Sequence, residues 1–308
     1  MMTTTFDVIA RTVLGGCNAE AADTIQRAGA DFLEPISWEV GFSVLAIPEW
    51  VWHPGKRPMR TASAVSRKAV ASLIQARIAA PGQHDDLLAK LLAARRPDTG
   101  EAMTEGQLVN NLSTFLLAGH DTTAKALTWA LYLLARAPDW QVRIRDEVKA
   151  IAGDRAIQAS NLERLPLTQM VIKETMRLYP PAPVLSRMST DWVEFGTHRV
   201  PPHSIIVIPI FAVHRNNRLW DDPDKFDPER FSPEREAKFA RAQFMPFGYG
   251  PRTCIGASFA MMEAAVLLAT FVRAARFDWD GRHLPEPISR VTLRPKGGMP
   301  LKVTLPTR

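Results

Sequence analysis

The stretch that decides the fold of this 308-residue chain is Phe244-Met245-Pro246-Phe247-Gly248-Tyr249-Gly250-Pro251-Arg252-Thr253-Cys254-Ile255-Gly256. It places one cysteine at the end of a loop of glycines and prolines, directly before an apolar run, Ala257 to Val272, that predicts a helix. A thiolate at Cys254 would lie near the partial positive charge of that helix N-terminus. The glycines allow a bulky planar group to approach the backbone closely. The stretch therefore predicts a site where the sulfur meets such a group.

Two side chains of this stretch support the prediction. Arg252 can meet a carboxylate of the bound group through charge-assisted hydrogen bonds, and Phe247 can cover the sulfur. The plainer alternative is a turn with an inert thiol. A dinucleotide-binding loop is excluded, because the glycine pattern continues to Thr253 where that fingerprint requires glycine, and no strand-to-helix turn surrounds it.

A long helix is predicted to begin at Thr104, because Thr104 and Gln107 have the spacing of a capping box. Its apolar stripe runs from Leu108 to Leu134, which is about eight turns and long enough to cross a whole core. The helix contains the segment Ala118-Gly119-His120-Asp121-Thr122-Thr123.

This segment suits a small diatomic ligand that must be protonated. Ala118 and Thr122 are four residues apart and share a helix face. Gly119 beside them has no side chain and so leaves space next to that face. Asp121 can supply a relayed proton, and Thr122 can hold the group that receives it or bond back to a carbonyl. The alternative is a helix-packing site, and His120 is interpreted as a packed or solvent-facing neighbour.

Glu174 and Arg177 lie three residues apart in a predicted helix and can pair on one face. An exposed pair of this kind is common and contributes little. A later segment, Asp227-Pro228-Glu229-Arg230-Phe231, brings a further arginine before the cysteine.

Together these patterns resemble the cytochrome P450 family. Its haem-binding loop has the spacing Phe-x-x-Gly-x-Arg-x-Cys-x-Gly, which is matched by Phe247, Gly250, Arg252, Cys254 and Gly256. The long-helix segment is similar to the family motif Ala/Gly-Gly-x-Asp/Glu-Thr-Thr, and Glu-x-x-Arg followed by Pro-Glu-Arg-Phe is also similar. The resemblance implies a mainly α fold with small β-sheets and haem b as cofactor, with Cys254 as the iron ligand.

The resemblance also implies roles for the other residues. Asp121 and Thr122 would serve oxygen activation, with Ala118 and Gly119 beside the haem. Glu174, Arg177 and Arg230 would form a buried structural cluster whose disruption costs several kcal/mol. Arg187, thirteen residues after Glu174, would meet a haem propionate, and a plain surface arginine is the competing interpretation.

The implied reaction inserts one oxygen atom of O2 into an apolar organic substrate. Electrons would come from a separate acidic redox partner, such as a ferredoxin or a flavin reductase. Three alternatives remain: a peroxide-dependent haem-thiolate enzyme, a truncated remnant with impaired haem binding that acts as a non-catalytic binding protein, and a helical protein of another family.

We expect one haem domain, with residues 1–103 as the family's middle helices and 104–308 as the haem-binding core. No tryptophan of this chain has arginine four residues later, whereas the family carries Trp-x-x-x-Arg on an earlier helix. We therefore expect the family's N-terminal portion, with its first strands and substrate-covering loop, to be missing here.

Composition supports a globular protein with a sizeable core, since 46% of residues are hydrophobic and 23% charged. No apolar run of ~18 residues predicts a membrane span, and no secretory signal is visible. The two cysteines suit a reducing compartment, so we expect a cytoplasmic protein. The net charge of +6 comes from scattered basic residues without a nucleic-acid motif, which favours an acidic partner or a solvated surface.

The remaining pattern predicts further elements along the chain. They are two helices in 3–46, a loop at 48–58, helices at 61–79, 86–94, 138–153 and 167–178, short strands in 192–213, an irregular segment at 216–241, and short strands after 272.

Overall fold

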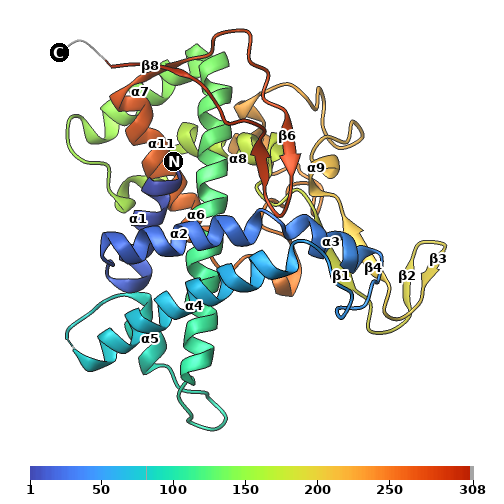
Figure 1. Ribbon diagram of the computed structural model, residues 1–308. Coiled ribbons are helices and arrows are strands. Elements are labelled where there is room, and N and C mark those ends of the chain that lie inside the picture. The colour runs from blue at the N-terminus through green and yellow to red at the C-terminus, as the bar shows by residue number, and fades with distance from the viewer. Residues whose placement is uncertain (81, 306–308) are drawn as a thin grey trace. The chain divides into compact units, whose positions relative to one another are not determined.

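A computed structural model describes residues 1–80 and 82–305 (Figure 1). Helices dominate, and the described strands form small two-stranded sheets, which confirms the mainly α fold. The chain forms two compact units, Met1–Ala124 and Lys125–Arg308. The long helix α6, Glu105–Arg136, contributes to both units. The expectation of a single haem domain stays a prediction.

The first unit is helical. In Figure 1, α2 and α4 lie side by side, and they share the most extensive helix contact of the unit. Buried apolar side chains such as Phe6 on α1 and Ile74 on α4 belong to its core. Besides α6, its helices are α1 (Met2–Leu14), α2 (Ala19–Leu33), α3 (Ile36–Val44), α4 (Lys56–Ala79) and α5 (Leu87–Ala93).

The capping residues act as the sequence predicts. The Thr104 backbone N–H donates to Oε1 of Gln107 over 2.8 Å, and the Gln107 N–H donates to Oγ1 of Thr104 over 3.3 Å. These reciprocal bonds satisfy donors that a helix start leaves free, and α6 begins at the next residue. Asp86 likewise caps α5 by accepting from the Ala89 N–H over 2.9 Å.

The expectation of two helices in residues 3–46 is wrong, because a third helix, α3, follows Pro35. None of its residues is buried, so the apolar periodicity that would predict a separate helix is weak there. Helix α4 also begins earlier than expected, at Lys56, and includes Pro58. A proline is tolerated there because the N–H groups of the first turn have no partner within the helix.

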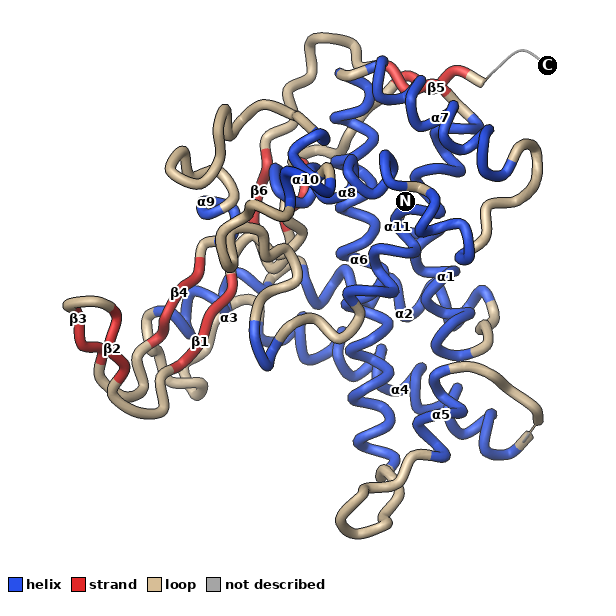
Figure 2. Tube along the Cα trace, turned by 180° about the vertical axis from the view of Figure 1, so that it is seen from behind, coloured by secondary structure: helices blue, strands red, loops and turns tan. Residues whose placement is uncertain are grey.

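The second unit combines helices with antiparallel two-stranded ladders, drawn in red in Figure 2. The strand pairs are β1–β4, β2–β3, β5–β8 and β6–β7. Its helical elements after α6 are α7 (Pro138–Ala152), η1 (Ala159–Arg164), α8 (Pro166–Leu178), α9 (Ile210–Val213), η2 (Pro228–Phe231), α10 (Pro233–Glu236), η3 (Gly250–Arg252) and α11 (Ala257–Ala274). Its strands are β1 (Leu185–Met188), β2 (Val193–Phe195), β3 (His198–Val200), β4 (Ile205–Ile208), β5 (Arg276–Asp278), β6 (Pro287–Ser289), β7 (Leu293–Pro295) and β8 (Lys302–Thr304).

The strand region differs from the prediction at both ends. Strand β1 begins at Leu185, before the predicted region, and pairs with β4 so that Arg187 lies opposite Ile206. The segment Ile210–Val213 is the short helix α9 and not a strand. Pro209 occupies the N-cap of α9, and because proline lacks a backbone N–H it interrupts a ladder more readily than a helix start.

The second unit has an aromatic core. Trp129 and Tyr132 on α6 are buried together with Leu178 at the end of α8. The Tyr179 ring stacks on Trp129 with centroids 3.8 Å apart and planes within 3°. This packing fixes the point at which α8 ends and the chain turns toward β1.

Among the described residues, α11 alone is long and apolar enough to cross a membrane by length and composition. The sequence predicted a helix over Ala257 to Val272 and no membrane span, because no apolar run reaches ~18 residues. The helix contacts α7 and α8, and its buried residues include Ala265 and Leu268. About a third of this helix is buried, and the absence of a membrane span stays a prediction.

Candidate functional site

The cysteine loop, residues 244–256, is closed by its own backbone. The Cys254 N–H donates to the Phe247 carbonyl over 2.9 Å, and the Gly248 N–H donates to the Met245 carbonyl over 3.0 Å. These bonds join the segment before the glycines to the cysteine. The position of the sulfur therefore depends on how residues 245–248 are held.

Two glycines of this loop have a left-handed backbone, with φ of 77° at Gly248 and 80° at Gly250. Residues with a side chain rarely adopt this conformation. A β-carbon at Gly248 would also lie 3.4 Å from Cδ1 of Leu185 on β1. The loop thus lies against β1, and glycine permits both the turn and the close approach.

The residues around the sulfur fit a planar apolar group that carries carboxylates. Cys254 is an exposed free thiol, and Ile255 beside it is 87% exposed, so a thiol and an apolar side chain are both available to a ligand. Arg252 is also exposed. Because side chains alternate along a strand, Arg187 shares the face of Leu185, the residue that touches the loop.

The arginines could both hold carboxylates. Arg187 is exposed and donates one bond, from Nη1, to the Ser186 carbonyl over 2.8 Å, and a guanidinium has five N–H donors in all. The residues present therefore fit haem. The role of Cys254 as the iron ligand stays a prediction, as do the roles of Arg187, Arg252, Phe247, Gly250 and Gly256 toward haem.

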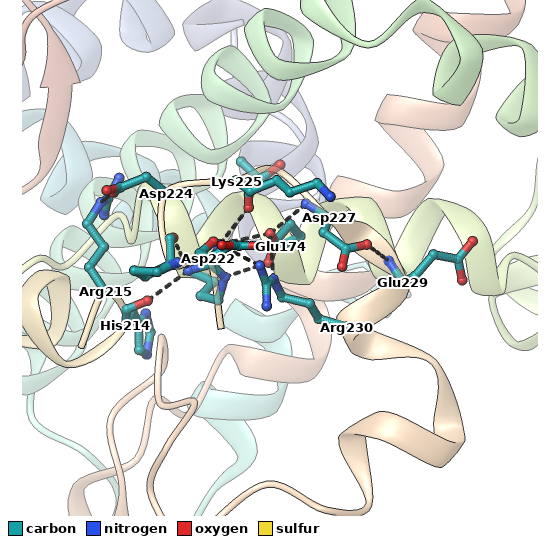
Figure 3. Close-up of polar contacts among 12 residues, drawn as sticks. Glu174, His214, Arg215, Asp222, Asp224, Lys225, Asp227, Glu229 and Arg230 are labelled. Carbon is teal, nitrogen blue, oxygen red and sulfur yellow. Dashed lines mark hydrogen bonds and ion pairs between the residues drawn. The ribbon is translucent and has the colours of Figure 1, made fainter. Parts of the chain in front are cut away.

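The structure brings Glu174, Arg177 and Arg230 together in one buried cluster, and Figure 3 labels two of them, Glu174 and Arg230. Nε of Arg177 lies 2.6 Å from Oε2 of Glu174, and its Nη2 lies 2.9 Å from Oε1, a bidentate pair with both side chains at 0% exposure. Arg230 is held less tightly, since its Nε lies 3.6 Å from Oε1 of Glu174. The strong interaction of the cluster is therefore the one within α8.

The Arg177 guanidinium also holds the segment that follows β4. Nη1 donates to the His214 carbonyl over 2.9 Å and to the Pro223 carbonyl over 2.6 Å, and Nη2 donates to the Lys225 carbonyl over 3.0 Å. One side chain of α8 thus organises an irregular stretch that leads toward the cysteine loop.

Glu174 adds a backbone contact, because the Asp227 N–H donates to its Oε1 over 2.8 Å. Burial raises the pKa of Glu174 above its ordinary value, and hydrogen bonding and charge from Arg177 act against that rise. The pairing is thus what offsets the cost of placing this carboxylate in the interior.

The α6 segment that resembles the oxygen-activation motif lies in the first unit. Oγ1 of Thr122 donates to the Ala118 carbonyl over 2.8 Å, as predicted for a hydroxyl that bonds back along its helix. Asp121 is buried. His120 is also buried, with Nδ1 2.6 Å from the Leu116 carbonyl and its ring edge-on to Phe6. His120 is therefore packed, as expected.

Gly119 has a packing role that the sequence offered as the alternative. A β-carbon there would lie 2.9 Å from Cδ1 of Ile9 on α1. A side chain at position 119 would force Ile9 to shift, so glycine favours the close packing of α1 on α6. A role for Gly119 and Ala118 beside haem stays a prediction, as do the roles of Asp121 and Thr122.

Sequence reasoning missed His214, the buried residue that ends α9. It bonds to Arg177 of the cluster formed by Glu174, Arg177 and Arg230, called the arginine cluster below. Its ring Nε2 accepts the backbone N–H of Met245 over 3.0 Å. Burial lowers its pKa to about 4, with the charges of Arg177 and Arg215 acting in the same direction. No spacing in the sequence links position 214 to position 245, so only the fold reveals this contact.

Comparison with known proteins identifies the family. The family model described as cytochrome P450 matches residues 1–301. The crystal structure of the cytochrome P450DA heme domain superposes with a TM-score of 0.86 at 25% identity, over 99% of this chain and 67% of that one. The chain belongs to the cytochrome P450 family.

Two relatives illustrate the range of similarity. Cyclooctatin synthase of Streptomyces melanosporofaciens is 39% identical over 71% of this chain and 46% of its own length. Cytochrome P450 72A11 of Arabidopsis thaliana is 32% identical over 98% of this chain and 60% of its own length. The chain thus spans roughly half the length of these relatives.

Proposed function

We propose that this chain is a cytochrome P450-type monooxygenase that binds haem b through Cys254 and inserts one oxygen atom of O2 into an apolar organic substrate, in the cytoplasm. The observation that supports this most directly is the cysteine loop, in which the Cys254 N–H is tied to Phe247 while the thiol stays exposed. Relatives named as hydroxylases, such as cytokinin hydroxylase of Arabidopsis thaliana, 40% identical over 70% of this chain, agree with it.

When bound, haem held by a cysteine thiolate supplies the electron density that favours cleavage of the O–O bond. The residues of this chain would hold the haem in place and deliver protons to the site. Arg252 and Arg187 would hold the propionates, as charge-assisted donors do for carboxylates. Cys254 would hold the iron from a loop whose backbone bonds are already formed.

Proton delivery would depend on Asp121 and Thr122. The Thr122 hydroxyl donates its proton to the Ala118 carbonyl, so its oxygen lone pairs remain able to accept. A hydroxyl in this state can accept a hydrogen bond from an acid and pass a proton onward by rotating. Asp121 is the neighbouring acid, and its burial limits access of bulk water.

Electrons would come from a separate acidic partner. Two exposed basic residues, Lys238 and Arg241, come just before the cysteine loop in the sequence. Nε of Arg241 donates to the Tyr249 hydroxyl over 3.1 Å, which fixes this charge beside the loop. Positive charge of this kind attracts an acidic ferredoxin or flavin reductase, and the attraction weakens with salt.

The test is the yield of hydroxylated product per electron, measured with the haem-loaded chain and a surrogate reductase. Thr122→Ala should lower the yield at least about tenfold, since proton transfer by a positioned group contributes on the order of 10²–10⁴-fold, while haem binding is unchanged. Thr114→Ala is the matched control, because its Oγ1 makes the same backward bond, to Asn110, over 2.8 Å in the same helix.

An equal yield for the two variants would contradict the proton-relay role. Failure of the wild-type chain to bind hemin would favour the alternative of a non-catalytic binding protein. Product formed equally well from added peroxide by wild type and Thr122→Ala would favour a peroxide-dependent enzyme.

A further inference from the structure

His214 connects two parts of the second unit that are far apart in the sequence. It follows α9, and its side chain is 0% exposed. Its carbonyl accepts a hydrogen bond from Nη1 of Arg177 over 2.9 Å. Its backbone is therefore held by the same guanidinium that pairs with Glu174.

The ring of the same residue reaches the cysteine loop. Nε2 accepts the Met245 N–H over 3.0 Å, and the ring stacks on Phe244 with centroids 5.3 Å apart and planes 30° apart. Trp220 closes another side, edge-on at 6.5 Å. These contacts fix the position and the orientation of the His214 ring against the first residues of the loop.

The contact with Met245 extends along the backbone to the sulfur. The Met245 carbonyl accepts the Gly248 N–H over 3.0 Å, and the Phe247 carbonyl accepts the Cys254 N–H over 2.9 Å. A shift of Met245 would move both acceptors, because residues 245–247 are consecutive. The Cys254 backbone is therefore tied to α8 through His214.

We propose that His214 is a positioning residue for Cys254. Its backbone carbonyl is bonded to Arg177 of the Glu174–Arg177 pair, and its ring is bonded to the Met245 N–H, so the pair holds the cysteine loop through His214. The role requires a ring nitrogen that accepts, so Nε2 must carry no proton. Burial favours a neutral ring, and the charges of Arg177 on α8 and of the adjacent Arg215 also oppose a further positive charge. For the haem-loaded protein the inference depends on the proposed function, whereas for the free chain it does not.

Two substitutions separate the acceptor from the bulk of the ring. His214→Phe keeps an aromatic ring against Phe244 and removes the acceptor. His214→Gln places a side-chain oxygen at about the reach of Nε2 and restores it. His53→Phe is a matched control, because His53 is a buried histidine of the first unit that pairs with Glu39 over 3.1 Å.

The first readout is hydrogen exchange at the Met245 amide of the haem-free chain, observed after selective 15N-methionine labelling. Loss of one hydrogen bond should accelerate this exchange about fivefold or more in His214→Phe. His214→Gln and His53→Phe should stay near the wild-type rate. The Met170 amide of α8 is the internal reference, since a general loss of stability would accelerate both amides equally.

Equal acceleration at Met170 and Met245, or no acceleration at Met245, would overturn the proposal. The second readout is the red-shifted Soret band of the reduced CO complex after hemin is added. We expect His214→Phe to lose part of this band and His214→Gln to keep it. If the wild-type chain forms no such band, the proposed function fails while the exchange measurement still decides the role of His214.

Discussion

The arginine cluster and the cysteine loop lie in the same unit. They differ in how far their side chains find partners within the chain. Glu174 and Arg177 have no exposed surface, and four backbone carbonyls or N–H groups complete their hydrogen bonding. Cys254 and Ile255 are exposed, and the loop is held by bonds within its own backbone and by His214. The Glu174–Arg177 pair is thus satisfied internally, whereas the cysteine offers its side chain to a partner from outside the chain.

The largest expected effect is on the cluster. Arg177→Met would leave Glu174 buried without its partner and should lower the free energy of unfolding by about 3–5 kcal/mol. Urea unfolding followed by circular dichroism measures the change. The double variant Glu174→Leu/Arg177→Met should recover part of the loss, because no unpaired charge then remains.

Arg235→Ala is the surface control for this measurement. Its Nη1 pairs with Asp227 over 3.1 Å at a partly exposed position, so the cost should stay within about 1 kcal/mol. A loss for Arg177→Met no larger than that of the control would contradict the assigned importance of the buried pair.

Acid should weaken the connection between the two regions. The pKa of His214 is lowered from 6.5 to about 4, so the unfolded chain binds its proton more readily than the folded chain. The stability that neutral His214 contributes is therefore present above pH 6.5 and is lost as the pH falls toward 4. From pH 7 to about pH 4.5, wild type should lose about 2–3 kcal/mol of stability relative to His214→Phe.

This comparison of two proteins isolates His214, because Glu174 and the other carboxyl groups titrate in both. The measurement is urea unfolding at a series of pH values. A stability difference that stays constant over this range would show that His214 is not the group that titrates.

A smaller effect is expected at Arg230. Its Nη2 donates to the Asp222 carbonyl over 2.9 Å, but its Nε is 3.6 Å from Glu174 and makes no hydrogen bond to the described residues. Arg230→Met should therefore cost about 1–2 kcal/mol, less than Arg177→Met. The same urea measurements rank the two, and an equal or larger loss at Arg230 would show that the cluster depends on both arginines alike.

Local signals in the sequence predicted much of the fold. The capping pair Thr104 and Gln107, the helix start at position 86, and the boundaries at Pro138 and Gly153 each depend on a few residues, and each marks an element end in the structure. Such signals work because capping and proline geometry depend on the local chain.

Contacts between distant segments could not be predicted in this way. Strand β1 is defined by its pairing with β4. Its four residues are too few to show the alternating pattern that predicts a strand. The closeness of Ile9 to Gly119 and the bond from Met245 to His214 depend on packing across many residues. The resemblance indicated the Glu174–Arg177–Arg230 cluster, but nothing in the sequence ranked its two arginines.

The most direct test of the account is the absorption spectrum of the reduced, CO-bound chain after hemin is added. We predict a red-shifted Soret band in the wild type and in Cys17→Ala, and its loss in Cys254→Ala. Because Cys254 is exposed, this substitution should change the free energy of unfolding of the haem-free chain by only about 0.5 kcal/mol or less. A Cys254→Ala protein with the wild-type band would contradict the assignment of the iron ligand.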